Sequence, residues 1–295
     1  MDLQYNIFVA IMYIFLFLFG ACVGSFLNVC IYRLPKGESL TKSNSHCMTC
    51  GTPILKRDLI PIVSWCMLRG KCRACKAPIS PRYTVVELLN AVGWLVIGLR
   101  FDMMGSGAGM KCILTCLVFS ALVVVFFMDW DTQLISTGVL IYIALIGVLQ
   151  IVLSIIGNMR LDCSIKYYII GAFAAGVPLL LISVISKERA MGMGDVYLMA
   201  AAGLFLGVHR VIAALFMGIL IGAVAGLILK HKSGESKFAF GPWLSIGIFI
   251  AMLWGWDIVN AYMNLTGLGE ILYGDGVITK LPNVPMLNPV IHLFF

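Results

Sequence analysis

The sequence has 295 residues, of which 61% are hydrophobic and only 12% are charged, and its mean hydropathy is +0.99. A soluble domain carries about 25% charged residues, so this chain has too little charge to cover a surface that faces water. These values exclude a soluble globular domain, a disordered chain and a small disulfide-stabilised domain. The composition predicts an all-α polytopic membrane protein.

Apolar runs of about 20 residues, the length that crosses a bilayer, recur along the chain. We expect about eight transmembrane helices, at residues 5–29, 83–100, 111–128, 134–156, 165–186, 194–208, 210–229 and 240–259. The domain organisation that follows is a first transmembrane helix (1–30), a polar segment (31–82), a transmembrane domain (83–260) and a C-terminal tail (261–295). The sequence gives no role for the tail.

The formal net charge of +7 is concentrated in residues 31–82, which hold ten Lys and Arg against two acids. This basic segment directly follows an apolar helix, so the positive-inside rule explains it better than binding to nucleic acid, and no nucleic-acid partner is expected. With the N-terminus outside, the inside loops hold fifteen Lys and Arg and the outside loops hold six, Arg210 among them. The sequence predicts that both termini lie outside and that residues 31–82 face the cytoplasm.

Four of the ten cysteines form two CxxC pairs, Cys47/Cys50 and Cys72/Cys75, separated by 21 residues. Two such pairs can complete a tetrahedral set of thiolates around Zn²⁺, and four thiolates leave no open position for a substrate. The spacing predicts a structural zinc site in a small zinc-ribbon-like domain between the first two helices. A redox or merely packed cysteine set is the alternative.

Carboxylates stand at the ends of two predicted spans, where acidic groups are costly and usually functional. Asp129 and Asp131 follow one span, and Asp195 opens another within Gly192-Met-Gly194-Asp195. By the predicted topology both ends face the cytoplasm, so the acids can meet in space. Two close carboxyl groups that share a proton can activate water, as in aspartic proteases.

The same acids also have purely structural interpretations. Asp195 is placed to cap a helix, and Asp131 is placed to be a solvated interfacial residue. A nucleophilic serine or cysteine is less favoured, because none of the four histidines lies in a comparable site, and no HExxH motif is present.

A set of motifs in fixed order identifies a resemblance. The blocks are Gly24-Ser-Phe-Leu-Asn28-Val-Cys-Ile-Tyr-Arg33-Leu-Pro35, the two CxxC pairs, Pro61-Ile-Val-Ser-Trp65, Arg69-Gly70-Lys71-Cys72, Ser80-Pro-Arg-Tyr83 with Glu87-Leu-Leu, Asp129-Trp-Asp131, Gly192-Met-Gly-Asp195 and Phe240-Gly-Pro242. Over residues 15–260 the sequence closely resembles the bacterial type IV prepilin peptidases, bifunctional leader peptidases and N-methyltransferases of the inner membrane.

The resemblance implies a function and its residues. Such an enzyme removes the leader of prepilins or pseudopilins after a glycine at the cytoplasmic face. It then methylates the new N-terminus with S-adenosyl-L-methionine. Asp129 and Asp195 would be the catalytic pair. Asp131, Gly192, Gly194, Gly241 and Pro242 would support the peptidase site, and Gly70 and Lys71 are candidates for methyl transfer. A tight turn and a solvated lysine are the alternative reading of the last two.

One position departs from the family pattern, and three other functions are alternatives to the one that the resemblance implies. Ser136 occupies a position that is usually proline in the family, which predicts a less rigid start to the following helix.

The alternative functions are a proton- or cation-coupled transporter with a zinc-binding regulatory loop, a presenilin-like or preflagellin-type GxGD protease, and a methyltransferase with an inactive peptidase half. The sequence does not indicate the oligomeric state or which prepilin is cleaved.

Overall fold

The computed structural model describes residues 3–41, 45–103, 109–157, 159, 161–188, 191–233 and 239–266. In these ranges the regular structure is helical, as predicted, apart from two isolated β-bridges. The tail predicted at 261–295 lies outside the described residues from position 267 onward. The elements are α1 (Leu3–Arg33), η1 (Leu34–Lys36), η2 (Lys56–Leu59), α2 (Val63–Met67), α3 (Arg82–Phe101), α4 (Gly109–Thr132), α5 (Thr137–Ile155), α6 (Ile165–Ile185), α7 (Met193–Leu206), α8 (Val208–Ser233) and α9 (Gly241–Thr266).

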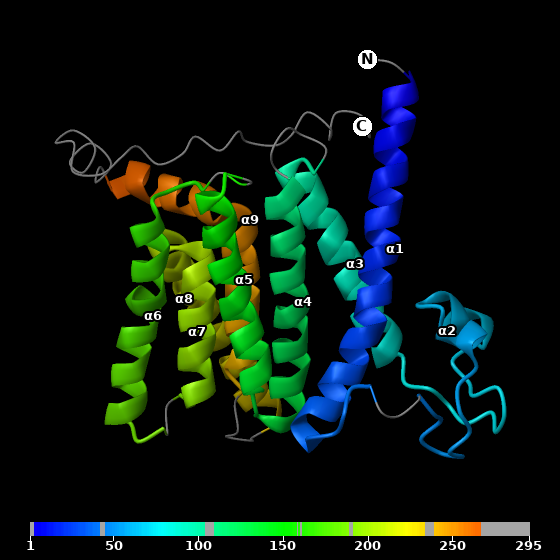
Figure 1. Ribbon diagram of the computed structural model, residues 1–295. Helices are drawn as coiled ribbons and strands as arrows, with labels where there is room; N and C mark the ends of the chain where they lie inside the picture. Colours follow the sequence, from blue (N-terminus) through cyan, green and yellow to red (C-terminus); the bar gives the residue numbers. More distant parts are fainter. Residues whose placement is uncertain are drawn as a thin grey trace. The chain divides into compact units, whose positions relative to one another are not determined.

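All eight predicted membrane helices are present, as α1 and α3 to α9 (Figure 1). Among the described residues, seven of them are long and apolar enough to cross a membrane. The eighth, α7, has only 14 residues and is about 21 Å long, less than the roughly 30 Å of a hydrocarbon core. It ends early because Gly207 turns the chain with a φ of 79° directly before α8 begins.

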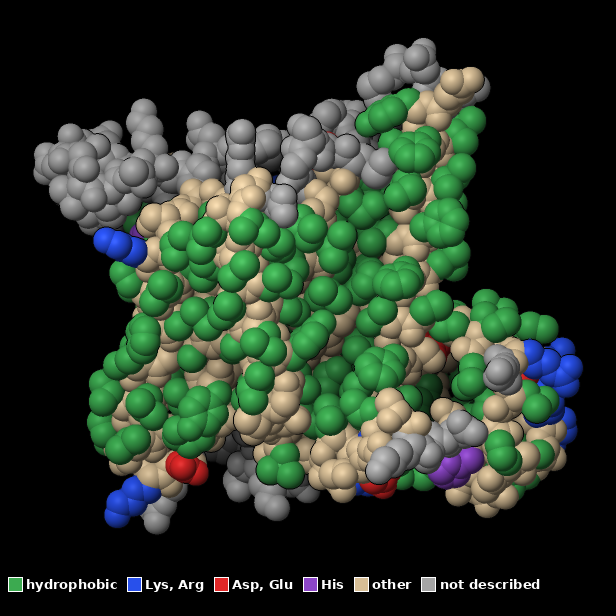
Figure 2. All heavy atoms as spheres, in the orientation of Figure 1, with side chains coloured by type: hydrophobic (Ala, Val, Ile, Leu, Met, Phe, Trp, Pro, Cys, Tyr) green, Lys and Arg blue, Asp and Glu red, His purple; other side chains and the backbone are tan. Residues whose placement is uncertain are grey.

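The outward side chains of these helices are apolar, as contact with lipid requires. Leu145 on α5 and Phe173 on α6 are both well over half exposed. Figure 2 shows hydrophobic side chains spread over the helical surfaces, while Lys and Arg gather at a few places. This distribution, inverted from that of a soluble protein, confirms the prediction of a multi-pass membrane protein.

The chain divides into two compact units, and the first comprises Met1–Met128. In this unit α1 and α3 pack at close range because α1 presents glycines to α3. A Cβ atom at Gly24 would lie 2.7 Å from the Cα of Glu87, and one at Gly20 would lie 3.0 Å from the Cα of Ala91. Small residues at such crossings let membrane helices approach closely.

A buried chain of hydrogen bonds joins three helices of the first unit. The Nδ2 of Asn90 on α3 donates to the carbonyl of Gly20 on α1 at 2.7 Å. The Ser120 hydroxyl on α4 donates to Asn90 Oδ1 and accepts from Trp94 Nε1, both at 2.9 Å. Satisfied polar groups in an apolar interior fix the rotation of each helix about its axis.

The second unit, Asp129–Phe295, contains the last turn of α4 and helices α5 to α9. Here α7 packs closely against α6, its neighbour in Figure 1. A Cβ atom at Gly171 on α6 would lie 2.6 Å from the carbonyl oxygen of Gly203 on α7. On its other side α7 meets α5, where a Cβ at Gly147 would lie 2.9 Å from the Cβ of Leu204. These contacts hold α7, which carries Asp195, on two sides.

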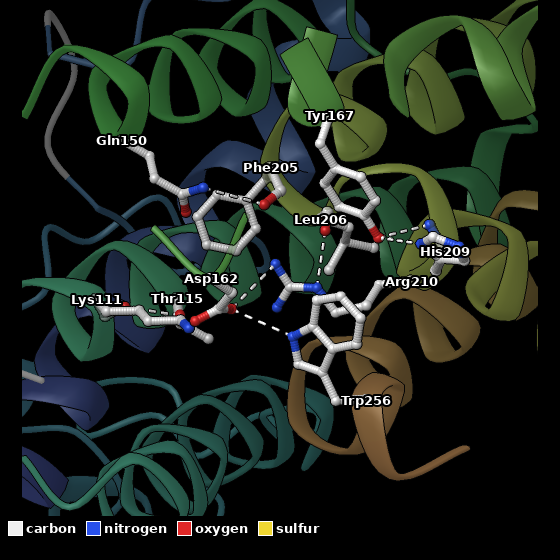
Figure 3. A network of polar contacts seen from close by, with 10 residues as sticks. All are labelled: Lys111, Thr115, Gln150, Asp162, Tyr167, Phe205, Leu206, His209, Arg210 and Trp256. Carbon is white, nitrogen blue, oxygen red and sulfur yellow. Dashed lines mark hydrogen bonds and ion pairs between the residues drawn. The ribbon is translucent and has the colours of Figure 1, made fainter. Parts of the chain in front are cut away.

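Arg210 differs from its expected place in an outside loop, because it is buried in the first turns of α8. Its Nε donates to the carbonyl of Leu206 at 2.8 Å, and its Nη2 lies 3.7 Å from the Oδ2 of Asp162 (Figure 3). The same Asp162 oxygen accepts from Trp256 Nε1 at 3.3 Å. A buried cation needs such partners, and this set ties α8 and α9 to the segment before α6.

Candidate active site

Asp129 lies in the last turn of α4, and its side chain is buried. Its Oδ2 accepts a hydrogen bond of 3.0 Å from the backbone N–H of Gly241, the first residue of α9. A Cβ atom at Gly241 would lie 2.7 Å from that same oxygen. Glycine is therefore the residue type that lets the carboxylate reach the amide. Pro242 follows in the first turn of α9, where a missing N–H costs nothing.

Asp195 lies in the first turn of α7, and its side chain is also buried. Gly192 caps the helix with an extended backbone and accepts a hydrogen bond of 3.2 Å from the N–H of Asp195. The carboxyl group of Asp129 lies near enough to that of Asp195 for its charge to act on it. The structure thus brings together two acids that are 66 positions apart in the sequence.

Ile135, in the short connection between α4 and α5, packs between two glycines of the site. A Cβ at Gly194 would lie 3.3 Å from the Cβ of Ile135, and one at Gly241 would lie 3.2 Å from its Cδ1. The end of α4 and the N-termini of α7 and α9 therefore meet at one place. Helix N-termini carry partial positive charge, which offsets part of the repulsion between two carboxylates.

Asp131 and Ser136 are two further positions that the sequence analysis singled out near Asp129 in the chain. Asp131 is exposed, in contrast to the buried Asp129 two residues before it. Ser136 is the N-cap residue of α5 with a φ of −66°, the angle that a proline would impose. The backbone angle at Ser136 is therefore one that a proline also adopts.

The four cysteines of the two CxxC pairs form a second candidate site, in the first unit. Their sulfur atoms all lie within 4.8 Å of one another, and the Sγ atoms of Cys47 and Cys75 are 3.9 Å apart. Thiolates bound to one Zn²⁺ lie about 3.8 Å apart, because each Zn–S bond is about 2.3 Å long. Cys66 and His46 lie between or beside the two pairs in the sequence but are outside this group of described residues.

The two pairs sit in hairpins of the same construction. The N–H of Cys47 donates to the carbonyl of Thr52, and the carbonyl of Cys47 accepts from the N–H of Gly51. Cys72 makes the same two hydrogen bonds, with the carbonyl of Ala77 and the N–H of Lys76. Backbone N–H groups point at the first sulfur of each pair and lower the pKa of the Cys47 and Cys72 thiols. Four thiols that share one centre, some of them with a lowered pKa, are suited to bind a metal ion.

Gly70 and Lys71 stand in the turn that leads into the second hairpin. Gly70 is buried with a φ of 66°, and a Cβ there would lie 2.9 Å from the ring of Trp65. Its backbone is bonded on both sides, to the carbonyl of Trp65 and the N–H of Ile79. Lys71 is exposed. The turn and the close contact with the Trp65 ring therefore account for glycine at position 70. No described contact restrains the Lys71 side chain.

Comparison with known proteins gives consistent matches. The model of the bacterial peptidase A24 N-terminal domain matches residues 18–101, and that of the type IV leader peptidase family matches residues 116–227. A prepilin leader peptidase/N-methyltransferase of Aeromonas hydrophila is 32% identical over 84% of this chain and 92% of its own length. Proteins with the same description from Pseudomonas aeruginosa and Bacillus subtilis are each 29% identical over 85% of this chain, and over 93% and 97% of their own lengths. No solved structure matches the chain significantly.

The chain belongs to the type IV leader peptidase family. It is therefore a peptidase, and the predicted resemblance is confirmed. Asp129 and Asp195 both fall inside the range matched by the leader peptidase model, whereas Gly241 lies beyond it. The cysteine pairs fall inside the N-terminal domain that precedes the peptidase model.

The sequence motifs missed one residue that contacts the turn before Asp195. Ser183, near the end of α6, is fully buried. Its hydroxyl donates to the carbonyl of Met191 at 3.1 Å and contacts the sulfur of Met193 at 3.6 Å. No signal in the sequence distinguishes this serine from others in apolar helices, because its hydrogen-bond partner, the carbonyl of Met191, lies beyond the end of α6.

Replacing Gly241 with alanine should slow peptide cleavage by about a hundredfold, since the added Cβ displaces the Asp129 carboxylate and small misplacements are costly. The measurement is the initial rate of cleavage by purified enzyme. Gly138→Ala, where the new Cβ meets only Ser136 Oγ at 3.6 Å, is the control and should keep the wild-type rate. A fully active Gly241→Ala enzyme would contradict the need for this contact.

Replacing Ser183 with alanine should lower kcat by about tenfold with little change in KM, because the turn that orients Asp195 loses a buried hydrogen bond. The matched control is Ser245→Ala, since the Ser245 hydroxyl is buried without a partner among the described residues. Steady-state kinetics on both variants measures the difference. Equal kcat values for the two variants would show that Ser183 does not position the turn.

Proposed function

We propose that this peptidase cleaves the leader peptides of type IV prepilins or pseudopilins, using Asp129 and Asp195 as its catalytic pair. The observation that carries the proposal is the meeting of two buried carboxyl groups at the ends of three helices. The relatives' description as prepilin leader peptidases supports the choice of substrate.

The proposed chemistry follows from the coupling of the two acids. In the proposed mechanism the two carboxyl groups share one proton and titrate as a pair. The ionised member takes a proton from a water molecule as the water attacks the carbonyl of the leader's last glycine. The protonated member polarises that carbonyl and then supplies the proton that the departing nitrogen requires. No covalent intermediate with the enzyme forms.

The setting of the pair fits a substrate that is itself held in the membrane. Asp129 ends a 24-residue apolar helix, so the pair lies at a membrane boundary rather than at midplane. We infer an inner-membrane protein with its termini outside, and with the cysteine segment and the aspartates at the cytoplasmic face. The fifteen Lys and Arg of the predicted inside loops, against five outside once the buried Arg210 of α8 is left out, support this orientation.

We further propose that Cys47, Cys50, Cys72 and Cys75 hold a structural zinc ion, and that this domain serves methyl transfer. Their geometry supports tetrahedral binding with all positions filled by sulfur, which stabilises the segment and leaves none for catalysis. S-adenosyl-L-methionine would supply the methyl group for the new N-terminus. Lys71, exposed beside Cys72, and the turn at Gly70 are the candidate residues for that step.

The intact mass of a prepilin product tests the acid pair. Wild-type enzyme should remove the leader and add one methyl group, while Asp129→Asn and Asp195→Asn should each cleave at least about a thousandfold more slowly. Asp131→Asn is the matched control and should retain cleavage, because Asp131 is exposed and outside the pair. Cleavage at the wild-type rate by either variant of the pair would refute the assignment.

Wild-type enzyme that cleaves none of several prepilins would instead overturn the proposed substrate. The alternative of a GxGD protease that acts on other membrane proteins would then become the leading one.

Metal analysis tests the cysteine site. Wild-type protein should contain about one zinc ion per chain, and Cys72→Ser should lose it together with methyl transfer while keeping leader cleavage. Cys66→Ser, which removes an exposed thiol outside the cluster, should change neither. Lys71→Ala should keep its zinc and lose methylation. A Cys72→Ser enzyme with full zinc content would exclude the four-cysteine site.

A further inference from the structure

Residues 56–67, which form η2 and α2 between the cysteine pairs, present apolar side chains outward. Leu59, Ile60, Val63 and Met67 are 44%, 52%, 49% and 76% exposed. Figure 2 shows hydrophobic side chains gathered where Figure 1 places α2, with Lys and Arg side chains beside them. A cluster of this kind is unfavourable in water and indicates a surface that another apolar phase covers.

A hydrogen bond fixes the depth of this segment along α3. The backbone N–H of Ile62 donates to Glu87 Oε2 at 2.7 Å. Glu87 is the sixth residue of α3, about 8 Å along the helix from its first residue. The 20 residues of α3 span about 30 Å, the thickness of the hydrocarbon core. The segment therefore meets α3 in the first third of a helix whose length matches the hydrocarbon core.

The hydrogen bond between Ile62 and Glu87 depends on the burial of Glu87, the backbone angle of Ile62 and the absence of a side chain at Gly24. Glu87 is buried, and a carboxyl group at this depth requires a donor such as the Ile62 amide. Ile62 makes the contact with a φ of 63°, a conformation that a β-branched residue adopts only under restraint. Gly24 on α1 leaves the space for the backbone of Glu87, since a Cβ there would lie 2.7 Å from its Cα.

We propose that residues 56–67 are an interfacial anchor whose apolar side chains insert into the lipid leaflet at the N-terminal end of α3. Around the Glu87 contact α3 also presents apolar side chains outward, since Val85 and Leu88 are 52% and 44% exposed. Arg57 and Arg69 are exposed near the apolar cluster. Interfacial segments place basic residues in this way, where they meet headgroup phosphates. The anchor holds the cysteine domain at the bilayer surface.

Photo-crosslinking to lipid tests the anchor in the full-length protein. A benzophenone amino acid replaces Met67, Phe15 or Met48, whose side chains are 76%, 62% and 64% exposed. Phe15 lies within the apolar helix α1 and is the positive control, while Met48 lies between Cys47 and Cys50 and is the negative control. Each variant is reconstituted in phosphatidylethanolamine and phosphatidylglycerol vesicles, irradiated, and analysed for lipid-bearing peptides by mass spectrometry.

The proposal expects the probe at position 67 to form lipid adducts at a yield close to that at position 15 and about tenfold above that at position 48. A yield at position 67 no higher than at position 48, with position 15 labelled, would overturn it. Crosslinks from position 67 to a second copy of the chain in place of lipid would also overturn it, because the apolar cluster would then be a protein interface.

Discussion

The hydrogen bond from the Gly241 amide to the Asp129 carboxylate joins residues 112 positions apart, and the arrangement of the acid pair depends on it. It fixes the end of α4 against the start of α9, and Ile135 fills the space beside it. Because no side chain stands at Gly241, the helix N-terminus itself supplies the donor. A buried carboxylate needs such a donor, because burial removes the water that would otherwise bind it.

Asp195 is held by packing more than by hydrogen bonds. Glycines on α6 and α7 bring these helices into backbone contact, and a third on α5 admits the other side of α7. The Ser183 hydroxyl then fixes the turn that precedes Gly192. In a membrane, where apolar side chains gain little by leaving lipid, close backbone packing and buried polar contacts supply the specificity that a hydrophobic core supplies in water.

The cysteine domain is stabilised differently from the helices, since it is small and its described residues include few buried apolar side chains. Two hairpins of equal construction bring four thiols to one centre, and an ion pair between Arg73 and Asp58 links η2 to the second hairpin. The Arg73 guanidinium lowers the pKa of the Asp58 carboxyl, so the pair stays ionised at neutral pH. A domain of this size requires a metal ion or attachment to a larger surface for stability.

The sequence by itself determined the helical membrane fold, the helices to within a few residues at most ends, the cysteine cluster and the family, because hydropathy and motif spacing are local properties. It also indicated that Asp129 and Asp195 could meet. Only the tertiary structure decided that Gly241 donates to Asp129, that Ser183 supports the turn before Asp195, and that Arg210 is buried beside Asp162. Each of these contacts joins different segments of the chain, and a local pattern carries no information about a partner brought close only by helix packing.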